Sequence, residues 1–233
     1  MGGCRLQRRG RHILWDHNFV RVDSNEAPHA NELIDFADRL HRERGRRFRS
    51  IPVFDPAAVE RLRPTFDELG WHRDGVVVMV HRRASDRLQP AVDTRECDEE
   101  TIRELRDRLR HEEKGDDADV TAEVVEQWGR VDALAQPYAA TRWFAAFDGG
   151  LPVSLCEVYS DGRTAQIEDV ATLESHRNRG FASANVLAAL EAAQRDHDLV
   201  FLVAAEDGWP KTLYRKLGFD VVGRWDHFVL RNR

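Results

Sequence analysis

A turn rich in basic residues joins an apolar, strand-like segment to a good helix, and its residue types are suited to binding an anion. It reads His-Arg-Asn-Arg-Gly-Phe-Ala over residues 176–182. The first N–H groups of a helix have no partners inside the helix, and that end carries a partial positive charge. Gly180 lets the backbone approach a ligand closely, and Arg177 and Arg179 add positive charge. The turn therefore predicts a site for an anion such as a pyrophosphate.

Two well-known phosphate loops do not fit this turn. No Gly-Lys-Ser/Thr follows it, so it is not a Walker loop, and a single glycine does not make a dinucleotide fingerprint. His176 could meet a phosphate when protonated, but an exposed loop histidine without a role is the favoured interpretation. The stretch HEEKGDD over 111–117 has metal-ligating residue types without ligand spacing, so we interpret it as a solvated linker and expect no metal.

The elements that must position the turn follow from hydrophobic periodicity. From residue 90 onward the predicted order is β-α-α-β-β-β-α-β-α-β. The expected segments are a strand at 90–95, helices at 98–113 and 120–135, three strands joined by turns at 148–150 and 161–162, a helix at 183–197, a strand at 199–207, a helix that ends at Gly218 and a strand at 224–230.

The N-terminal part predicts a smaller set of elements. These are a strand at 13–23, a helix at 29–45, a strand at 50–55, a helix at 56–70 and a strand at 76–82. Pro64 should kink or shorten the second helix. A polar stretch then marks a boundary near Asp86, which predicts two domains, at 1–86 and 87–233.

The order strand, helix, strand, helix, Leu-Gly-aromatic, strand occurs twice in the chain. The same spacing separates Val22 from Gly70 and Val170 from Gly218. Few residues are identical between the two stretches, so coincidence remains the alternative. We favour a duplicated unit whose first copy is truncated at its N-terminus.

Residues 90–230 resemble the GCN5-related N-acetyltransferase (GNAT) superfamily. The family's acyl-CoA loop, Arg/Gln-x-x-Gly-x-Gly/Ala, is matched by Arg177, Gly180 and Ala182. The stretch IEDVAT resembles its fourth strand, and LYRKLGF its late helix and following strand. The resemblance implies an α/β (α+β) GNAT fold, with a mixed, mostly antiparallel sheet flanked by helices. Here an N-terminal half-GNAT repeat would precede it.

The resemblance also implies a ligand, acetyl-CoA, as cosubstrate. Its pantetheine arm would pair with the backbone at Val170 and Thr172 like an added strand. Asp207 stands where many members have Asn and could contact CoA, although a helix cap is the favoured role. The pyrophosphate would bind the turn, through Arg177, Asn178, Arg179, Gly180, Phe181, Ala182 and Ser183.

The implied reaction is direct transfer of an acetyl group to a primary amine in a ternary complex. The amine must lose a proton and the thiolate must gain one. Tyr214 matches the family's acid, with a core aromatic as the alternative role. Glu168 stands where the family often has a base, with a solvated or salt-bridged carboxylate as the alternative. By the period of two, it should share a face of the strand with Val170, and Asp169 should point the other way.

The first copy differs at the position of the turn. In the alignment of the two copies, Glu32 takes the place of Gly180 and His29 that of Arg177. A carboxylate would repel a pyrophosphate, so we expect the first copy to bind no CoA. Because the first copy lacks the family's early strands, an exposed sheet edge there could support a homodimer.

The composition of the chain argues against some classes of partner and of cellular compartment. The formal net charge of −6 argues against nucleic acid, and no apolar run is long enough to cross a membrane. The cysteines Cys4, Cys97 and Cys156 are far apart, which is typical of a reduced, cytoplasmic protein without a disulfide framework.

The acceptor remains open, as a small-molecule or peptide amine. Three aromatic residues flank the region that shapes the acceptor pocket in the family, although core packing is the favoured role for Trp128, Tyr138 and Trp143. One alternative is a non-catalytic acyl-CoA-binding regulatory module. Another is a tandem acetyltransferase of a thiol-sugar pathway, such as mycothiol synthase.

Overall fold

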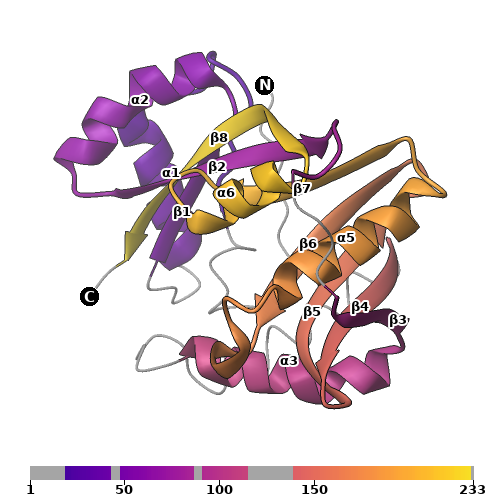
Figure 1. The fold of residues 1–233 in the computed structure, drawn as a ribbon. Helices are drawn as coiled ribbons and strands as arrows, with labels where there is room; N and C mark the ends of the chain where they lie inside the picture. Colours follow the sequence, from indigo (N-terminus) through magenta and orange to yellow (C-terminus); the bar gives the residue numbers. More distant parts are fainter. Residues whose placement is uncertain (1–18, 43–47, 87–90, 115–138, 232–233) are drawn as a thin grey trace. The chain divides into compact units, whose positions relative to one another are not determined.

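The computed structural model describes residues 19–42, 48–86, 91–114 and 139–231 (Figure 1). The chain divides into two compact units. The first unit comprises residues 1–77, 205–207 and 223–233, and the second comprises 78–204 and 208–222. The boundary therefore falls inside a strand, between Val77 and Val78, rather than near Asp86, and the end of the chain returns to the first unit.

The first unit is built on a helix–strand–helix–strand segment. Its elements are α1 (Ala30–Arg42), β1 (Phe48–Val53), α2 (Pro56–Glu68) and the start of β2 (His72–His81). The end of β8 (Phe219–Arg231) pairs with β1 in antiparallel fashion, from Phe48↔Arg231 to Val53↔Asp226. Val22 makes an isolated parallel bridge to Val53. The part of the predicted first strand that precedes residue 19 lies outside the described residues.

Helix α2 continues past Pro64, because its side chains pack in the core. Asp55 caps the helix, because its Oδ1 accepts a hydrogen bond from Ala58 N–H at 2.8 Å. Phe66 is fully buried two residues beyond the proline, and its ring stacks on Phe228 with centroids 4.5 Å apart. Pro64 therefore does not end the helix, since buried side chains on both sides of it hold the helix in place, and a kink at Pro64 stays a prediction.

The second unit contains the predicted antiparallel meander and a parallel strand beyond it. In order its sheet runs β7-β6-β5-β4-β3, with β6 and β7 parallel and the other pairs antiparallel. The bounds of its elements are β3 (Asp93–Cys97), α3 (Glu99–Lys114), β4 (Ala140–Asp148), β5 (Leu151–Ser160), β6 (Thr164–Thr172), α5 (Phe181–Gln194), β7 (Leu199–Ala205) and α6 (Trp209–Lys216).

Two helices cover opposite faces of this sheet. Asn185 of α5 donates a hydrogen bond to Ser154, and Arg106 of α3 forms an ion pair with Glu157. Residues 154 and 157 are an odd number of positions apart on β5, so their side chains point to opposite faces. This is the mixed sheet flanked by helices that the sequence predicts. The predicted helix at 120–135, together with Trp128 and Tyr138, lies outside the described residues.

Candidate functional site

The parallel strands β6 and β7 pair over only part of their length. The pairing runs from Thr164↔Leu199 to Ile167↔Leu202, whereas β6 continues to Thr172. Beyond Ile167 the backbone of β6 is no longer matched to β7 in this register. An extended ligand could add to a strand edge of this kind, as the sequence predicts for Val170 and Thr172.

A β-bulge interrupts β6 beside this edge. Leu155 and Glu157 of β5 pair with Ala171 and Glu168, so β6 has one more residue than β5 between the two pairs. Asp169 takes up the extra length with a φ of 52°. Directly paired residues lie on one face of a sheet, so Glu168 lies on the face of Ala171 and Glu157. The prediction that Glu168 shares a face with Val170 is therefore wrong, because the bulge breaks the period of two.

The basic turn has the backbone geometry of an anion site. A short 3-10 turn, η2 (Glu174–His176), is followed by Asn178 with a φ of 63° and by Gly180 with a φ of 91°. Gly180 immediately precedes α5, and the first backbone bond of this helix runs from Ala184 N–H to the Gly180 carbonyl at 3.0 Å. The N–H groups ahead of Ala184 have no carbonyl one turn back in the helix. They are therefore available to a ligand, and the left-handed residues shape the loop that presents them.

An acidic residue of the β4–β5 turn contacts the basic side chains. Asp148 Oδ2 forms an ion pair with Arg179 Nη2 at 2.8 Å and lies 3.6 Å from His176 Nε2. Arg177 donates from Nε to the Thr172 carbonyl at 3.3 Å. A bound pyrophosphate would compete with Asp148 for Arg179. Sequence reasoning interpreted Asp148 only as a turn residue and missed this contact.

The Glu168 carboxyl has the protonation behaviour of a base near neutral pH. Its burial, and then the negative charge of Asp169, raise the pKa of Glu168 to about 7, although a hydrogen bond from the Gln166 side chain opposes the shift. Glu157, which pairs directly with it from the neighbouring strand β5, raises the pKa of Glu168 further. A group with a pKa near the working pH can both accept and release a proton efficiently.

Tyr214 is protonated at neutral pH. It lies near the end of α6, is 7% exposed, and its ring meets the edge of Phe219 at 6.4 Å between centroids. Burial is the main cause that raises its pKa, and the charges of Glu168 and Cys156 add to it. The structure thus brings the two predicted catalytic residues into one electrostatic neighbourhood. A neutral phenol there can donate a proton to a departing thiolate.

A buried ion pair lies next to Glu168, and a single feature of the sequence hints at it. Glu157 is 2% exposed and accepts hydrogen bonds from Arg106 of α3 and, at 2.6 Å, from the Tyr159 hydroxyl. These two partners hold its carboxylate in place on the face that Glu168 shares. The hint was a charged residue inside the apolar run VSLCEVYS, but its partner comes from a distant helix.

A polar network fixes the end of β6 to α5. Ser154 is fully buried and donates to the Ala171 carbonyl at 2.8 Å. It accepts from the Thr172 hydroxyl at 2.8 Å and from the Asn185 amide at 3.0 Å. Buried polar groups of this kind specify one arrangement when they are bonded to one another. Thr172 is therefore held by its own hydroxyl beside the turn.

The structure also describes two further residues from the sequence analysis, Asp207 and Trp143. The N-cap of α6 is Gly208, with no capping side chain, so the capping role favoured for Asp207 is wrong. Asp207 belongs to the first unit. Trp143 packs with Ile102, Ala145 and Phe147 in a hydrophobic cluster, as the core-packing interpretation expects.

Glu32 does not correspond to Gly180 in the structure. Glu32 lies inside the first turn of α1, whereas Gly180 immediately precedes α5. The residue that precedes α1 is His29, so the alignment that pairs Glu32 with Gly180 is wrong, because the connection before α1 is shorter. No glycine stands among the six residues before α1, and the expectation that the first copy binds no CoA stays a prediction.

Among the residues described, no group of three or more His, Cys, Asp or Glu side chains could hold a metal ion. Within the same residues, none of the helices is long and apolar enough to cross a membrane.

Comparison with protein-family models identifies the family to which the chain belongs. The model of the acetyltransferase (GNAT) family matches residues 100–219, just over half of the 233 residues. The chain belongs to the GNAT family. The match includes the Gly180 turn, Glu168 and Tyr214, and members of this family use acetyl-CoA as cosubstrate. No curated protein sequence matches the chain.

Solved structures share the GNAT fold at low sequence identity. A conserved protein of unknown function from Staphylococcus epidermidis has a TM-score of 0.72 at 15% identity, over 96% of this chain and 88% of its own. A GNAT from Sphaerobacter thermophilus has a TM-score of 0.60 at 17% identity, over 87% and 68%. A tandem GNAT from the clavulanic acid biosynthesis pathway has a TM-score of 0.59 at 18% identity, over 87% and 70%.

Proposed function

We propose that this GNAT protein transfers an acetyl group from acetyl-CoA to a primary amine at the junction of β6, α5 and α6. The observation that supports it best is the end of the β6–β7 pairing at Ile167↔Leu202, next to the left-handed Gly180 turn that opens α5. One ligand needs both features. Its extended arm would add to the edge of β6, and its pyrophosphate would bind the N–H groups of the turn.

With the exception of Asp207, the predicted ligand residues would contact CoA in this arrangement. The backbone at Val170 and Thr172 would pair with the pantetheine arm. Backbone N–H groups from Asn178 to Ser183 would face the pyrophosphate, and Arg177 and Arg179 would add charge to it. Gly180 is the residue that this geometry constrains most, since its φ of 91° lies where L side chains are strained.

The two titratable residues would divide the proton transfers. An ammonium acceptor gives a first proton to the Glu168 carboxylate, which releases it to solvent, and the free amine attacks the acetyl carbonyl. The same carboxylate then takes the second proton from the nitrogen of the tetrahedral intermediate. As the carbon–sulfur bond breaks, the thiolate takes a proton from the Tyr214 hydroxyl, and solvent then restores the phenol. The pKa of about 7 at Glu168 and the raised pKa of Tyr214 are consistent with these opposite roles.

The acceptor would be a small-molecule or peptide amine. A thiol-release assay with acetyl-CoA and a panel of polyamines, amino sugars, amino acids and peptide N-termini tests this proposal. Release of CoA that depends on one class of amine would support it. Tight CoA binding without release of CoA in the presence of any amine would favour a non-catalytic acyl-CoA-binding module instead.

We also propose that the first unit is a partial, degenerate GNAT copy. Helices α2 and α6 end alike: Leu69 and Leu217 have nearly identical dihedral angles, and the glycine after each has a positive φ. Phe66 contacts Trp71 at 5.0 Å between centroids, as Tyr214 contacts Phe219 at 6.4 Å. The phenylalanine cannot donate a proton. Calorimetric titration with acetyl-CoA should therefore give one site per chain, and two sites would contradict the proposal.

A further inference from the structure

The segment that follows β2 binds the C-terminal end of α6. Arg82 N–H donates to the Gly218 carbonyl at 3.0 Å, and Asp86 N–H donates to the Lys216 carbonyl at 2.8 Å. Ser85 adds a hydroxyl bond to the Lys216 carbonyl at 3.3 Å. The last carbonyls of a helix have no partners within it, so residues 82–86 satisfy groups that α6 leaves open.

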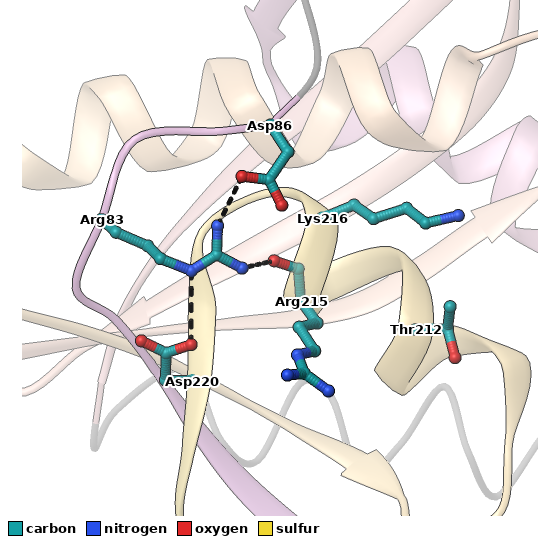
Figure 2. A pocket seen from close by; sticks show the side chains of 6 residues that line it. All are labelled: Arg83, Asp86, Thr212, Arg215, Lys216 and Asp220. Atoms are coloured by element: carbon teal, nitrogen blue, oxygen red, sulfur yellow. Dashed lines mark hydrogen bonds and ion pairs between the residues drawn. The ribbon is translucent and has the colours of Figure 1, made fainter.

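Arg83 is the centre of this contact (Figure 2). Its guanidinium donates to the Arg215 carbonyl, to Asp86 at 2.8 Å and to Asp220 at 3.4 Å. One side chain therefore joins the end of α6, the start of β8 and its own segment. A cavity of about 390 Å³ lies beside it, lined by Arg83, Asp86, Thr212, Arg215, Lys216 and Asp220. Because each of the three guanidinium nitrogens donates to a protein acceptor, we assign Arg83 to holding the contact between residues 82–86 and the end of α6, which we call the α6 corner, rather than to binding a ligand in the cavity.

The corner also excludes side chains at Gly218. A Cβ there would lie 2.1 Å from the Arg83 carbonyl oxygen and 2.9 Å from His81 Nε2. At Gly70, which ends α2 with a similar backbone, a Cβ would meet nothing within 4 Å. The close approach is therefore particular to α6. His81 continues the contact, since its ring meets Phe219 at 5.3 Å, and Phe219 meets Tyr214 at 6.4 Å.

Tyr214 lies on the last turn of α6, the helix that ends at this corner. The helix that carries it has only eight residues, and isolated helices of that length are unstable in water. Tyr214 immediately precedes Arg215, whose carbonyl Arg83 binds. We propose that Arg83 is a positioning residue for Tyr214, which fixes the last turn of α6 and so directs the phenol toward the departing thiolate. This inference rests on the acetyl-transfer function proposed above.

A double-mutant cycle tests the inference. Steady-state rates would be measured for Arg83→Ala, Tyr214→Phe and the double variant, with Arg163→Ala as an exposed-arginine control. Because small misplacements of a catalytic group are costly, Arg83→Ala should lower kcat about tenfold with little change in KM for acetyl-CoA. In the Tyr214→Phe background the same change should cost less than about twofold, since there is no phenol left to position. Equal losses in the two backgrounds would overturn the inference.

Further measurements keep failure of the inference separate from failure of the proposed function. Hydrogen exchange at the Leu217 and Gly218 amides should be faster in Arg83→Ala than in Arg163→Ala, and unchanged exchange would refute a role for Arg83 at the end of α6. If Tyr214→Phe keeps full activity, the acid role of Tyr214 fails while the exchange result still decides the role of Arg83. Arg83→Lys, which keeps the charge but not the fork of donors, replaces Arg83→Ala if that variant does not fold.

Discussion

The carboxylate of Glu168 lies close enough to Tyr214 that its charge raises the pKa of the phenol. One residue comes from the bulged part of β6 and the other from the last turn of α6, more than forty positions later in the chain. In the proposed acetyl transfer, this pair would serve the proton transfers to and from the amine and the thiolate. A base whose pKa is about 7 is half ionised at neutral pH, whereas the neighbouring phenol remains protonated.

The pH profile of the reaction should report Glu168. Because the base must be ionised, kcat/KM should fall about tenfold per pH unit below about pH 7. In Glu168→Gln this acid limb should disappear, and the rate at pH 8 should drop by about 100-fold. Glu191→Gln, which alters an exposed carboxylate on α5, is the control and should keep the limb. An unchanged limb in Glu168→Gln would assign it to another group.

The same pKa shift predicts how stability depends on pH. The pKa of Glu168 is higher in the folded state than in the unfolded chain, so the folded state favours the protonated carboxyl. Its contribution is fully present below about pH 4.5 and is lost as the pH rises through about 7. Glu168→Gln should therefore match the wild type near pH 4 and exceed it at pH 8, by up to roughly 3 kcal/mol. Urea unfolding at the two pH values measures the difference, and a gain at pH 4 alone would have the wrong sign.

Tyr214→Phe should separate chemistry from binding. Loss of the hydroxyl should lower kcat by about 100-fold, because the thiolate must then leave without a positioned acid. The phenol is not expected to contact the pyrophosphate, so the dissociation constant for acetyl-CoA should stay within about twofold. Steady-state kinetics and calorimetric titration measure the two effects. Undiminished turnover would leave Tyr214 with the role of a core aromatic.

Local signals were sufficient to predict the turn and the meander. The glycine before α5, the glycine turns between β4, β5 and β6, and the apolar run of β7 each show their conformation within a few residues. The observed helix begins at Phe181 rather than at the predicted residue 183, a difference within the usual uncertainty of helix ends. These features explain why the family's fold and the Gly180 turn could be predicted without a structure.

Features that depend on distant partners were not predicted. The bulge at Asp169 places a non-glycine residue at a positive φ, and no residue in the neighbouring sequence predicts such a bulge. The Arg106–Glu157 pair joins α3 to β5, and the unit boundary inside β2 depends on where β8 returns. The mistaken alignment of Glu32 with Gly180 has a similar origin, since equal spacing in sequence did not reveal the shorter connection before α1.

Binding of acetyl-CoA to Gly180→Glu, compared with Gly162→Glu, tests the central claim most directly. Both glycines have positive φ, 91° and 85°, so both substitutions strain the backbone, but only Gly180 opens α5. Calorimetric titration should show wild-type affinity in Gly162→Glu and no binding in Gly180→Glu, with both variants folded by circular dichroism. Wild-type affinity for acetyl-CoA in a folded Gly180→Glu variant would contradict the account.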